Sequence, residues 1–294
     1  MRNTLYDKDL KPALYIVATP IGNSFDISPR AKEVLTNVDL VACEDTRVTG
    51  KLFERLELTP PKLISYHDKN ESQRAEEILE KMLSDNLNVA IVSDAGTPCV
   101  SDPGYRIAAL AHEKNIKVIP VPGASAVITL AMASGLPTDR FCFIGFLPHK
   151  KEARKSEVEG WNKSFGSVIF YEAATRIEDS LKIISSIWPK AKIAIGRELT
   201  KTFEEIVQFS AQESMSWIAE KNKSHSLKGE FVVMCSGFES VLSEEDLVSR
   251  ITKEAEKGFL EGKSHKKLLK EMAHYNFERS KLYDLLLDIK KSLK

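Results

Sequence analysis

Charged and small residues gather in short segments that each follow an apolar, strand-like run. Residues 44–47 read Glu-Asp-Thr-Arg, residues 93–98 read Ser-Asp-Ala-Gly-Thr-Pro, and residues 101–104 read Ser-Asp-Pro-Gly. A carboxylate pair beside an arginine can hold a group of altered pKa or orient a hydroxyl. Small residues let backbone amides and carbonyls approach a ligand closely, and Asp94 can accept hydrogen bonds from that ligand. We therefore expect a ligand site, with the segment 93–104 as its strongest signal.

Two further segments of the first half are weaker signals taken alone. Residues 19–23, Thr-Pro-Ile-Gly-Asn, hold one glycine where a dinucleotide fingerprint needs three, which argues against nicotinamide or flavin binding. His67 is a candidate acid, base or phosphate contact. For Asp68, Asn70 and Glu71 we expect a structural role, with Asn70 or Asp68 capping the next helix and Glu71 favouring its dipole.

Small or polar clusters recur farther along the chain. Residues 122–126, Pro-Gly-Ala-Ser-Ala, open a helix and either present free N–H groups to a ligand or serve close helix–sheet packing. Tyr171 and Glu172, followed by Arg176, end one strand, and residues 197–201, Arg-Glu-Leu-Thr-Lys, end another. These clusters favour a second ligand-facing region, although any one of them can be a structural ion pair.

Such segments meet in space if their strands are parallel, because ligands of open α/β sheets gather at the carboxyl ends of the strands. Continuous apolar strands separated by helices predict a parallel sheet that is covered on both faces. The first 120 residues alternate in this way, and the predicted strands are 13–18, 40–43, 63–66, 89–93 and 117–120.

The predicted fold class is α/β, with two α/β domains and a small C-terminal helical module. The second sheet has strands near residues 193 and 206 with no room for a helix between them, so a hairpin or other short connection makes that sheet mixed. Ser243 is expected in the N-cap region of the helical tail. The predicted domains are 12–138 (N-terminal, mainly parallel sheet), 139–238 (C-terminal, mixed sheet) and 243–294 (helical).

Composition excludes several classes of protein. The 294 residues are 43% hydrophobic, which excludes a mostly disordered chain. Lys plus Arg and Asp plus Glu both number 42, which argues against a globally basic nucleic-acid coat protein but leaves room for local basic faces. One such stretch, 257–270, has five lysines against Glu261, and another, 140–163, has a local charge of +3.

The four cysteines show neither CxxC nor zinc spacing, so we expect reduced thiols of a cytosolic protein and no metal site. The uncharged stretch 118–138 is interrupted by prolines and is too short to cross a membrane as a helix. The N-terminus lacks the apolar core of a secretory signal.

Together the motifs resemble the tetrapyrrole-methylase superfamily of S-adenosylmethionine-dependent methyltransferases, and within it the group that methylates small-subunit ribosomal RNA. They run in family order over about residues 12–237, and residues 262–287 resemble the helix-turn-helix module that ends this group. The motifs are VATPIGN (17–23), CEDTR (43–47), SYHDKNE (65–71), SDAGTPCVSDPG (93–104), PGASA (122–126), YEAATRI (171–177), RELTK (197–201) and KGEFVV (228–233).

The resemblance implies a homodimer that binds S-adenosylmethionine in a cleft between its two α/β domains. It also implies methyl transfer to a cytidine ribose 2′-hydroxyl in the decoding region of the 16S RNA of the small ribosomal subunit. The cofactor contacts that it implies are Pro20, Asp94, Gly96, Thr97, Ser125 and Ala126, with Tyr171 and Leu199 from the second domain.

A ribose hydroxyl is a weak acid, so the reaction needs help with deprotonation. The candidates for a base or hydroxyl-orienting group are Glu44, Asp45, His67 and Lys201, and Arg47 is a candidate phosphate contact. Two alternatives stay open because one scaffold can host several functions. They are a precorrin or porphyrin methyltransferase, for which a basic helical tail has no use, and an RNA-binding protein without catalysis.

Overall fold

The computed structural model describes residues 11–161, 166–224, 227–238, 244–275 and 277–293. The chain divides into two compact units. The first comprises the chain up to Ala133 together with Gly196–Ile206, and the second comprises Ser134–Ile195 together with the chain from Val207 onward. Leu199 and Lys201 therefore belong to the first unit, although they follow a strand of the second sheet.

The first unit is built on a five-stranded sheet in the order β3-β2-β4-β1-β5, and every pair of neighbouring strands is parallel. Its strands are β1 (Ala13–Val17), β2 (Leu40–Cys43), β3 (Lys62–Ser65), β4 (Val89–Val92) and β5 (Lys117–Val121). Its helices are α1 (Pro29–Asn37), α2 (Thr46–Arg55), α3 (Glu71–Ser84), α4 (Tyr105–Glu113) and α5 (Ala126–Ala133), with a short 3-10 turn, η1 (Ser24–Asp26).

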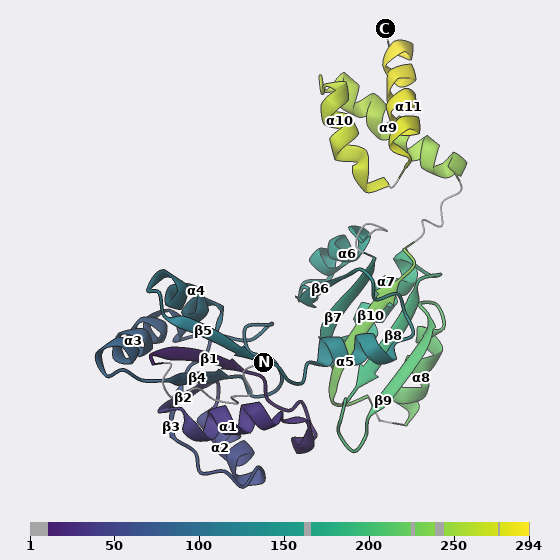
Figure 1. Ribbon diagram of the computed structural model, residues 1–294. Coiled ribbons are helices and arrows are strands. Elements are labelled where there is room, and N and C mark those ends of the chain that lie inside the picture. The colour runs from purple at the N-terminus through teal and green to yellow at the C-terminus, as the bar shows by residue number, and fades with distance from the viewer. Residues whose placement is uncertain (1–10, 162–165, 225–226, 239–243, 276, 294) are drawn as a thin grey trace. The chain divides into compact units, whose positions relative to one another are not determined.

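Helices cover both faces of this sheet, as predicted (Figure 1). Successive strand residues point to opposite faces, so Tyr15 and Leu14 enter different cores. Tyr15 packs in the cluster that includes Val34 of α1 and Phe53 of α2. Leu14 packs in the cluster that includes Leu79 of α3. The apolar strands therefore bury both faces, and only their ends remain for polar chemistry.

Helix α2 was not expected from the sequence, which indicated a loop after β2. Its residues 46–50 include two threonines, a valine and a glycine, all weaker helix formers than alanine. Asp45 caps the helix by accepting a hydrogen bond from the backbone N of Arg47, and Phe53 anchors it in the core. By contrast, α1 begins with a preferred cap residue, since Ser28 Oγ accepts from Ala31 N at 3.1 Å.

The second unit contains a five-stranded sheet in the order β6-β7-β10-β8-β9. The sheet is mixed, as predicted, because β6 pairs with β7 in parallel and β10 pairs with β7 antiparallel. Strands β8 and β9 are neighbours joined by a short connection. The strands are β6 (Phe141–Phe146), β7 (Ser167–Ala173), β8 (Lys192–Arg197), β9 (Glu205–Ser210) and β10 (Glu230–Ser236), and the helices are α6 (Lys151–Glu159), α7 (Ile177–Ile187) and α8 (Ser214–Lys223).

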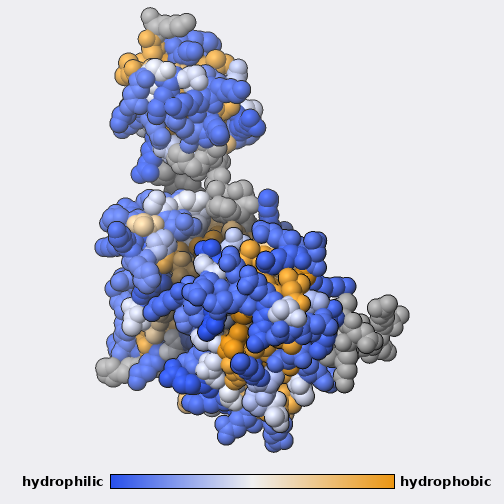
Figure 2. Space-filling model, turned by 90° about the vertical axis from the view of Figure 1, so that its left-hand side faces the viewer, coloured by the Kyte–Doolittle hydropathy of each residue, from blue (hydrophilic) through white to orange (hydrophobic). Residues whose placement is uncertain are grey.

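The C-terminal helices form a cluster around a core of their own, which includes Ile251, Leu268 and Leu286. They are α9 (Glu244–Leu260), α10 (His265–Glu271), the 3-10 helix η3 (Met272–Tyr275) and α11 (Arg279–Ser292). Figure 2 shows mostly hydrophilic side chains on the visible face of this cluster. The expected cap at Ser243 falls outside the described residues.

Pairing reduces the basic character of this helical cluster. Lys263 lies 3.5 Å from Glu261 and 3.2 Å from Glu271, and Lys267 lies 3.9 Å from Glu271. Two of the five lysines counted in 257–270 thus pair with an acid just beyond that stretch. None of the helices in the described ranges is long and apolar enough to span a membrane.

Candidate functional site

The loops at the carboxyl edge of the parallel sheet are joined by hydrogen bonds. Thr19 N donates to Gly96 O at 2.8 Å and Gly96 N donates to Thr19 O at 3.1 Å, which links the loops after β1 and β4. Gly96 has a φ of +83°, a conformation that favours glycine. Thr97 Oγ1 donates to Ala124 O at 3.0 Å and adds the loop after β5. Hydrogen bonds therefore connect three of the predicted segments, 19–23, 93–98 and 122–126, to one another.

Side chains from the loop after β2 approach the same edge. Asp94 Oδ1 accepts a hydrogen bond from Asp45 N at 3.1 Å. The Asp45 carboxylate in turn accepts from Arg47 N, Nε and Nη2 at 2.8, 3.0 and 2.6 Å. These hydrogen bonds hold the pKa of Asp45 well below its usual range. Asp45 is therefore a helix cap and a partner of Arg47, and its carboxylate is a poor proton acceptor.

Three other carboxyl groups at this edge have raised pKa values. Burial is the first cause for Glu44, Asp94 and Asp102, and mutual repulsion adds to it: Asp94 and Asp102 act on Glu44, Asp45 acts on Asp94, and Asp94 acts on Asp102. Within the described part of the chain, none of the three forms an ion pair, and no group of His, Cys, Asp and Glu side chains suits a metal ion. An edge that gathers partly buried acids without basic partners favours an organic cation.

His67, which follows β3, is half-buried. Its Nδ1 atom is buried and has no hydrogen-bond partner among the residues that the structure describes. Asn70 lies at the N-cap position of α3, which is one of the two positions expected, but its side chain does not form the expected capping hydrogen bond. Its Oδ1 instead accepts from His67 N at 2.9 Å and its Nδ2 donates to Ser65 O at 3.3 Å, which fixes the loop that carries His67.

Glu71 has a larger structural role than the helix-dipole role expected of it. It is only 9% exposed, and its Oε1 accepts hydrogen bonds from Tyr66 Oη at 3.1 Å and from Gly104 N at 3.0 Å. Arg106 pairs with its other oxygen at 3.4 Å. Glu71 thereby ties the end of β3 to the end of the long loop 93–104. Gly104 and Arg106 lie more than thirty residues from Glu71 in the sequence, so no local sequence pattern reveals these two partners.

The loop between β8 and β9 lies against the loop after β1. Thr200 Oγ1 accepts a hydrogen bond from Asn23 N at 3.0 Å. Lys201 pairs with Glu198 at 3.1 Å. Glu198 and Thr200 adopt φ values of +49° and +65°, a strained conformation for residues other than glycine. Leu199, between them, is buried. The structure thus brings two predicted site residues, Leu199 and Lys201, to the 19–23 loop.

Gly22 makes this approach possible, and its replacement by alanine should destabilise the first unit by about 1–3 kcal/mol through overpacking. A Cβ at position 22 would lie 2.5 Å from Lys201 Cγ and 2.8 Å from Thr200 Oγ1. Gly50, inside α2, is a matched control because a Cβ there meets nothing within 4 Å. Gly50→Ala should stabilise by up to about 1 kcal/mol. Calorimetry measures the melting temperature of the two variants. A Gly22→Ala protein that melts at the wild-type temperature would disprove the packing requirement.

The remaining residues expected at the cofactor lie as follows. Pro20 is buried, and Ser125 and Ala126 are half-buried at the start of α5. Just before them, a Cβ on Gly123 would lie 3.0 Å from the Cβ of Ala18, so close helix–sheet packing is present there. Tyr171 lies in the second unit, on β7, where its ring contacts Phe143 and Phe146 at 5.0 and 5.5 Å.

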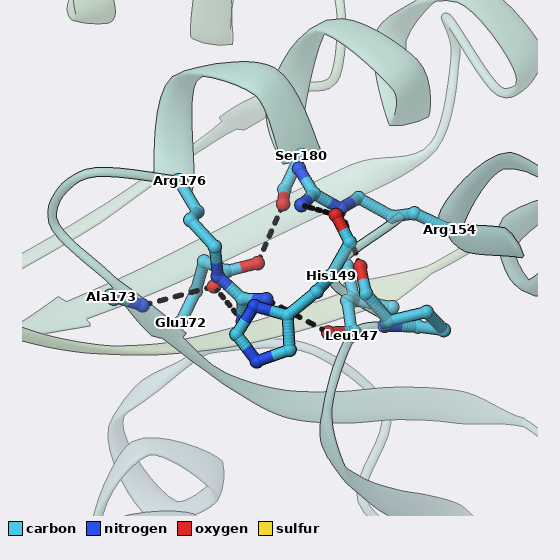
Figure 3. A network of polar contacts seen from close by, with 8 residues as sticks. Leu147, His149, Arg154, Glu172, Ala173, Arg176 and Ser180 are labelled. Atoms are coloured by element: carbon cyan, nitrogen blue, oxygen red, sulfur yellow. Dashed lines mark hydrogen bonds and ion pairs between the residues drawn. The ribbon is translucent and has the colours of Figure 1, made fainter. Parts of the chain in front are cut away.

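The cluster at the end of β7 is a buried ion pair. The Glu172 side chain is fully buried, and its Oε1 lies 2.5 Å from Nη2 of Arg176, which is 15% exposed. Its Oε2 accepts from Ser180 Oγ at 2.6 Å and Oε1 also accepts from Ala173 N at 3.0 Å. Figure 3 shows these groups converging on the carboxylate. This geometry is structural, which is one of the two roles expected for the cluster.

The joined loops and the three acids lie at the carboxyl edge of a parallel sheet, which is the edge where open α/β proteins generally bind their ligands. The chain belongs to the family of tetrapyrrole (corrin/porphyrin) methylases, whose sequence profile matches residues 13–214. It is therefore a member of a methyltransferase family, and the predicted resemblance is confirmed.

Relatives named ribosomal RNA small subunit methyltransferase I are similar along most of the chain. The protein from Vibrio cholerae is 46% identical over 228 residues, which cover 77% of this chain and 78% of the relative. The protein from Synechocystis is 39% identical over 281 residues, 94% of this chain and 98% of the relative. This second match extends into the helical C-terminal cluster.

Solved structures share the fold. The methyltransferase CobJ has a TM-score of 0.56 at 17% identity and covers 76% of this chain and 94% of its own. Cobalt precorrin-4 methyltransferase has a TM-score of 0.52 at 14% identity with the same coverage. At such identities the likeness concerns the fold alone.

Proposed function

We propose that this protein transfers the methyl group of S-adenosylmethionine to the ribose 2′-hydroxyl of a cytidine in the decoding region of small-subunit ribosomal RNA. The observation that carries the proposal is the 39–46% identity to the relatives from Synechocystis and Vibrio cholerae, which bear the name of a small-subunit ribosomal RNA methyltransferase. The joined loops at the edge of the parallel sheet support it, because they match the segments expected to hold the cofactor.

The residues at this edge suit S-adenosylmethionine. Burial and neighbouring carboxylates raise the pKa values of Glu44, Asp94 and Asp102. A cation beside these acids would offset that cost, and the cofactor carries positive charge on its sulfonium and amino groups. Pro20, Gly96 and Thr97 on the joined loops, together with Ser125 and Ala126, are the proposed contacts on the same unit. Leu199 and Tyr171 are proposed as further contacts.

When bound, the cofactor supplies an electrophilic methyl carbon, so the protein mainly has to align the ribose oxygen with it and remove a proton. Among the four candidate bases, Asp45 is held by Arg47 and Lys201 by Glu198. Glu44 and His67 remain. We assign the proton transfer to Glu44, because burial together with Asp94 and Asp102 raises its pKa and makes it a stronger base than an ordinary glutamate, and because it lies among the acids proposed to meet the cofactor. Arg47, whose side chain is largely exposed, is proposed to contact a substrate phosphate.

The proposed function is tested with labelled S-adenosylmethionine and purified small ribosomal subunits that lack the modification. Label should enter the RNA, and mapping of the modified nucleotide should place it on a cytidine ribose in the decoding region. Label on a base or at another site would overturn the specificity. Label only on a precorrin or porphyrin would favour the small-molecule alternative. Cofactor binding without any transfer would contradict the catalytic role, and absence of binding by isothermal titration would favour an RNA-binding protein.

Replacing Asp94 by asparagine should weaken S-adenosylmethionine binding about tenfold or more, because a charge-assisted hydrogen bond contributes about 1.5–3 kcal/mol. Asparagine retains an oxygen that can accept from Asp45 N, so the loop is preserved. S-adenosylhomocysteine keeps every hydrogen-bond donor of the cofactor and lacks only the charge on sulfur, so its affinity should fall by a similar factor if the contact is a hydrogen bond. Equal dissociation constants for the variant and the wild type in isothermal titration would exclude a contact with Asp94.

We further propose a cytoplasmic homodimer. Ribosomal subunits are cytoplasmic, and the four cysteines are free thiols, two of them buried. Light scattering during gel filtration measures the mass, for which the dimer predicts twice the 32.9 kDa of one chain.

A further inference from the structure

The segment that follows β6 is held by two arginines through its backbone. Arg176 Nη1 donates to Leu147 O at 3.2 Å. Arg154, which is only 4% exposed, donates from Nε to Pro148 O at 3.0 Å and from Nη2 to His149 O at 3.2 Å. Figure 3 shows both guanidinium groups directed at this segment. Three successive carbonyls thus have a charged partner, so the backbone of 147–149 is fixed.

The fixed segment is preceded by an aromatic side chain that the sheet directs outward. A register shift between Phe143 and Phe146 marks a bulge in β6, and Gly145 within it has a φ of +68°. Bulges of this kind redirect the side chains that follow them. Phe146 is 54% exposed, and it rests against Tyr171 at a ring distance of 5.5 Å. One face of a well-supported aromatic ring is therefore open to solvent.

Exposed basic side chains follow the fixed segment. His149, Lys150 and Lys151 are exposed, and among the described residues neither lysine pairs with a carboxylate. Lys155, one turn farther along α6, lies 3.7 Å from Glu159 and is thereby partly neutralised. The positive charge available to a partner is thus concentrated beside Phe146.

We propose that residues 146–151 form a binding surface for single-stranded RNA, on which Phe146 stacks against a base while Lys150 and Lys151 contact neighbouring phosphates. Stacking on an aromatic side chain together with basic contacts is how proteins hold unpaired nucleotides. A ring flanked by unpaired cations suits such a partner better than it suits an apolar protein surface. The inference rests on the proposed function, because it gives the RNA substrate a place on the second unit. Arg154 and Arg176 are positioning residues, since they act through the backbone of 147–149.

Binding of a fluorescein-labelled, unstructured 12-nucleotide RNA, followed by anisotropy over a range of potassium chloride concentrations, tests the surface. The double variant Lys150→Ala/Lys151→Ala should bind more weakly and lower the slope of log K against log salt by about 1.4, since each phosphate contact to a single strand contributes about 0.7. The control Lys190→Ala/Lys192→Ala removes the same charge from exposed positions of the same unit and should leave the slope unchanged. Equal slopes for the two double variants would overturn the phosphate contacts.

Phe146 variants test the stacking separately. Phe146→Ala should lower the affinity about 5- to 150-fold, the equivalent of 1–3 kcal/mol for one stacked base, at an unchanged salt slope. Phe146→Trp should retain the affinity, whereas Phe146→Leu, which keeps an apolar side chain without a ring, should not. The proposal would be overturned if Phe146→Ala or Phe146→Leu bound the RNA with wild-type affinity. It would also be overturned if the wild type did not bind the RNA.

Methyl transfer measured in parallel separates this inference from the proposed function. On small subunits, the Lys150→Ala/Lys151→Ala variant should raise KM for the subunit about tenfold or more and leave the cofactor dissociation constant unchanged. If the wild type methylates subunits and the variant has an unchanged KM, the proposed RNA-binding surface is disproved and the proposed function is retained. If the wild type binds the RNA probe through these residues but transfers no methyl group to subunits, the proposed RNA-binding surface is retained and the proposed function is disproved.

Discussion

Replacing Glu172 by alanine is expected to lower the free energy of unfolding of the second unit by about 3–5 kcal/mol. The substitution leaves the guanidinium of Arg176, 15% exposed, without its carboxylate, and it also removes the acceptor of the Ser180 hydroxyl. An unpaired charge in the interior costs more than the pair contributes when it is intact. The three tryptophans, Trp161, Trp188 and Trp217, all lie in this unit, so tryptophan fluorescence during urea unfolding reports on it alone.

Glu178 provides the matched control for this prediction. It pairs with Lys182 at 2.6 Å and at the same i,i+4 spacing, but both side chains are substantially exposed. Glu178→Ala should therefore cost no more than about 1 kcal/mol. Similar losses of stability in the two variants would contradict a structural role for the buried pair. Glu172→Ala should also loosen the 147–149 segment, because Arg176 holds both the carboxylate and Leu147 O.

Glu44→Gln is expected to lower the rate of methyl transfer about 100- to 10,000-fold, the usual effect of losing a general base. The amide is nearly the same size as the carboxyl group but cannot accept the ribose proton. Cofactor affinity, measured by isothermal titration, should change far less than the rate. The comparison variant is Asp45→Asn, which keeps an oxygen for capping α2 and should retain most of the activity.

The pH dependence of the rate gives a second measurement for Glu44. A base must be unprotonated, so activity falls as the pH decreases through its pKa. Burial, with Asp94 and Asp102, raises the pKa of Glu44, so this loss should occur at a higher pH than for an ordinary glutamate. Asp45, whose pKa is lowered, would cause a loss only in much stronger acid. Full activity in Glu44→Gln would exclude Glu44 and leave His67. A loss confined to strong acid in the wild type would also exclude Glu44.

The sequence was sufficient to predict the parallel sheet because its strands are continuous apolar runs with a helix between most of them. The sequence also allowed the prediction that the segments 19–23, 93–98 and 122–126 lie at one edge of the sheet, because the carboxyl ends of parallel strands share an edge. It failed for α2, whose residues have weak helix propensity. That helix is specified by the Asp45 cap and by burial of Phe53, and burial depends on tertiary structure.

The partners of individual side chains could not be predicted. Asp45 and Glu44 are adjacent, yet one is neutralised by Arg47 and the other lies among acids from other loops, which gives their pKa values opposite shifts. Asp102 belonged to a segment that was recognised, but no local pattern singled out its carboxyl group. Glu71 was likewise expected to act only on its own helix, because its hydrogen bond to Gly104 N spans 33 positions of the chain.

The two arginines that hold residues 147–149 have a consequence for how this surface can change. Their hydrogen bonds end on carbonyl oxygens, which every amino acid provides, so the fixed path does not depend on which side chains stand at these positions. The identity of residue 149, and of the exposed residues beside it, can therefore vary under selection or in a designed library without loss of the scaffold. Variation at Arg154 or Arg176 should be far less tolerated.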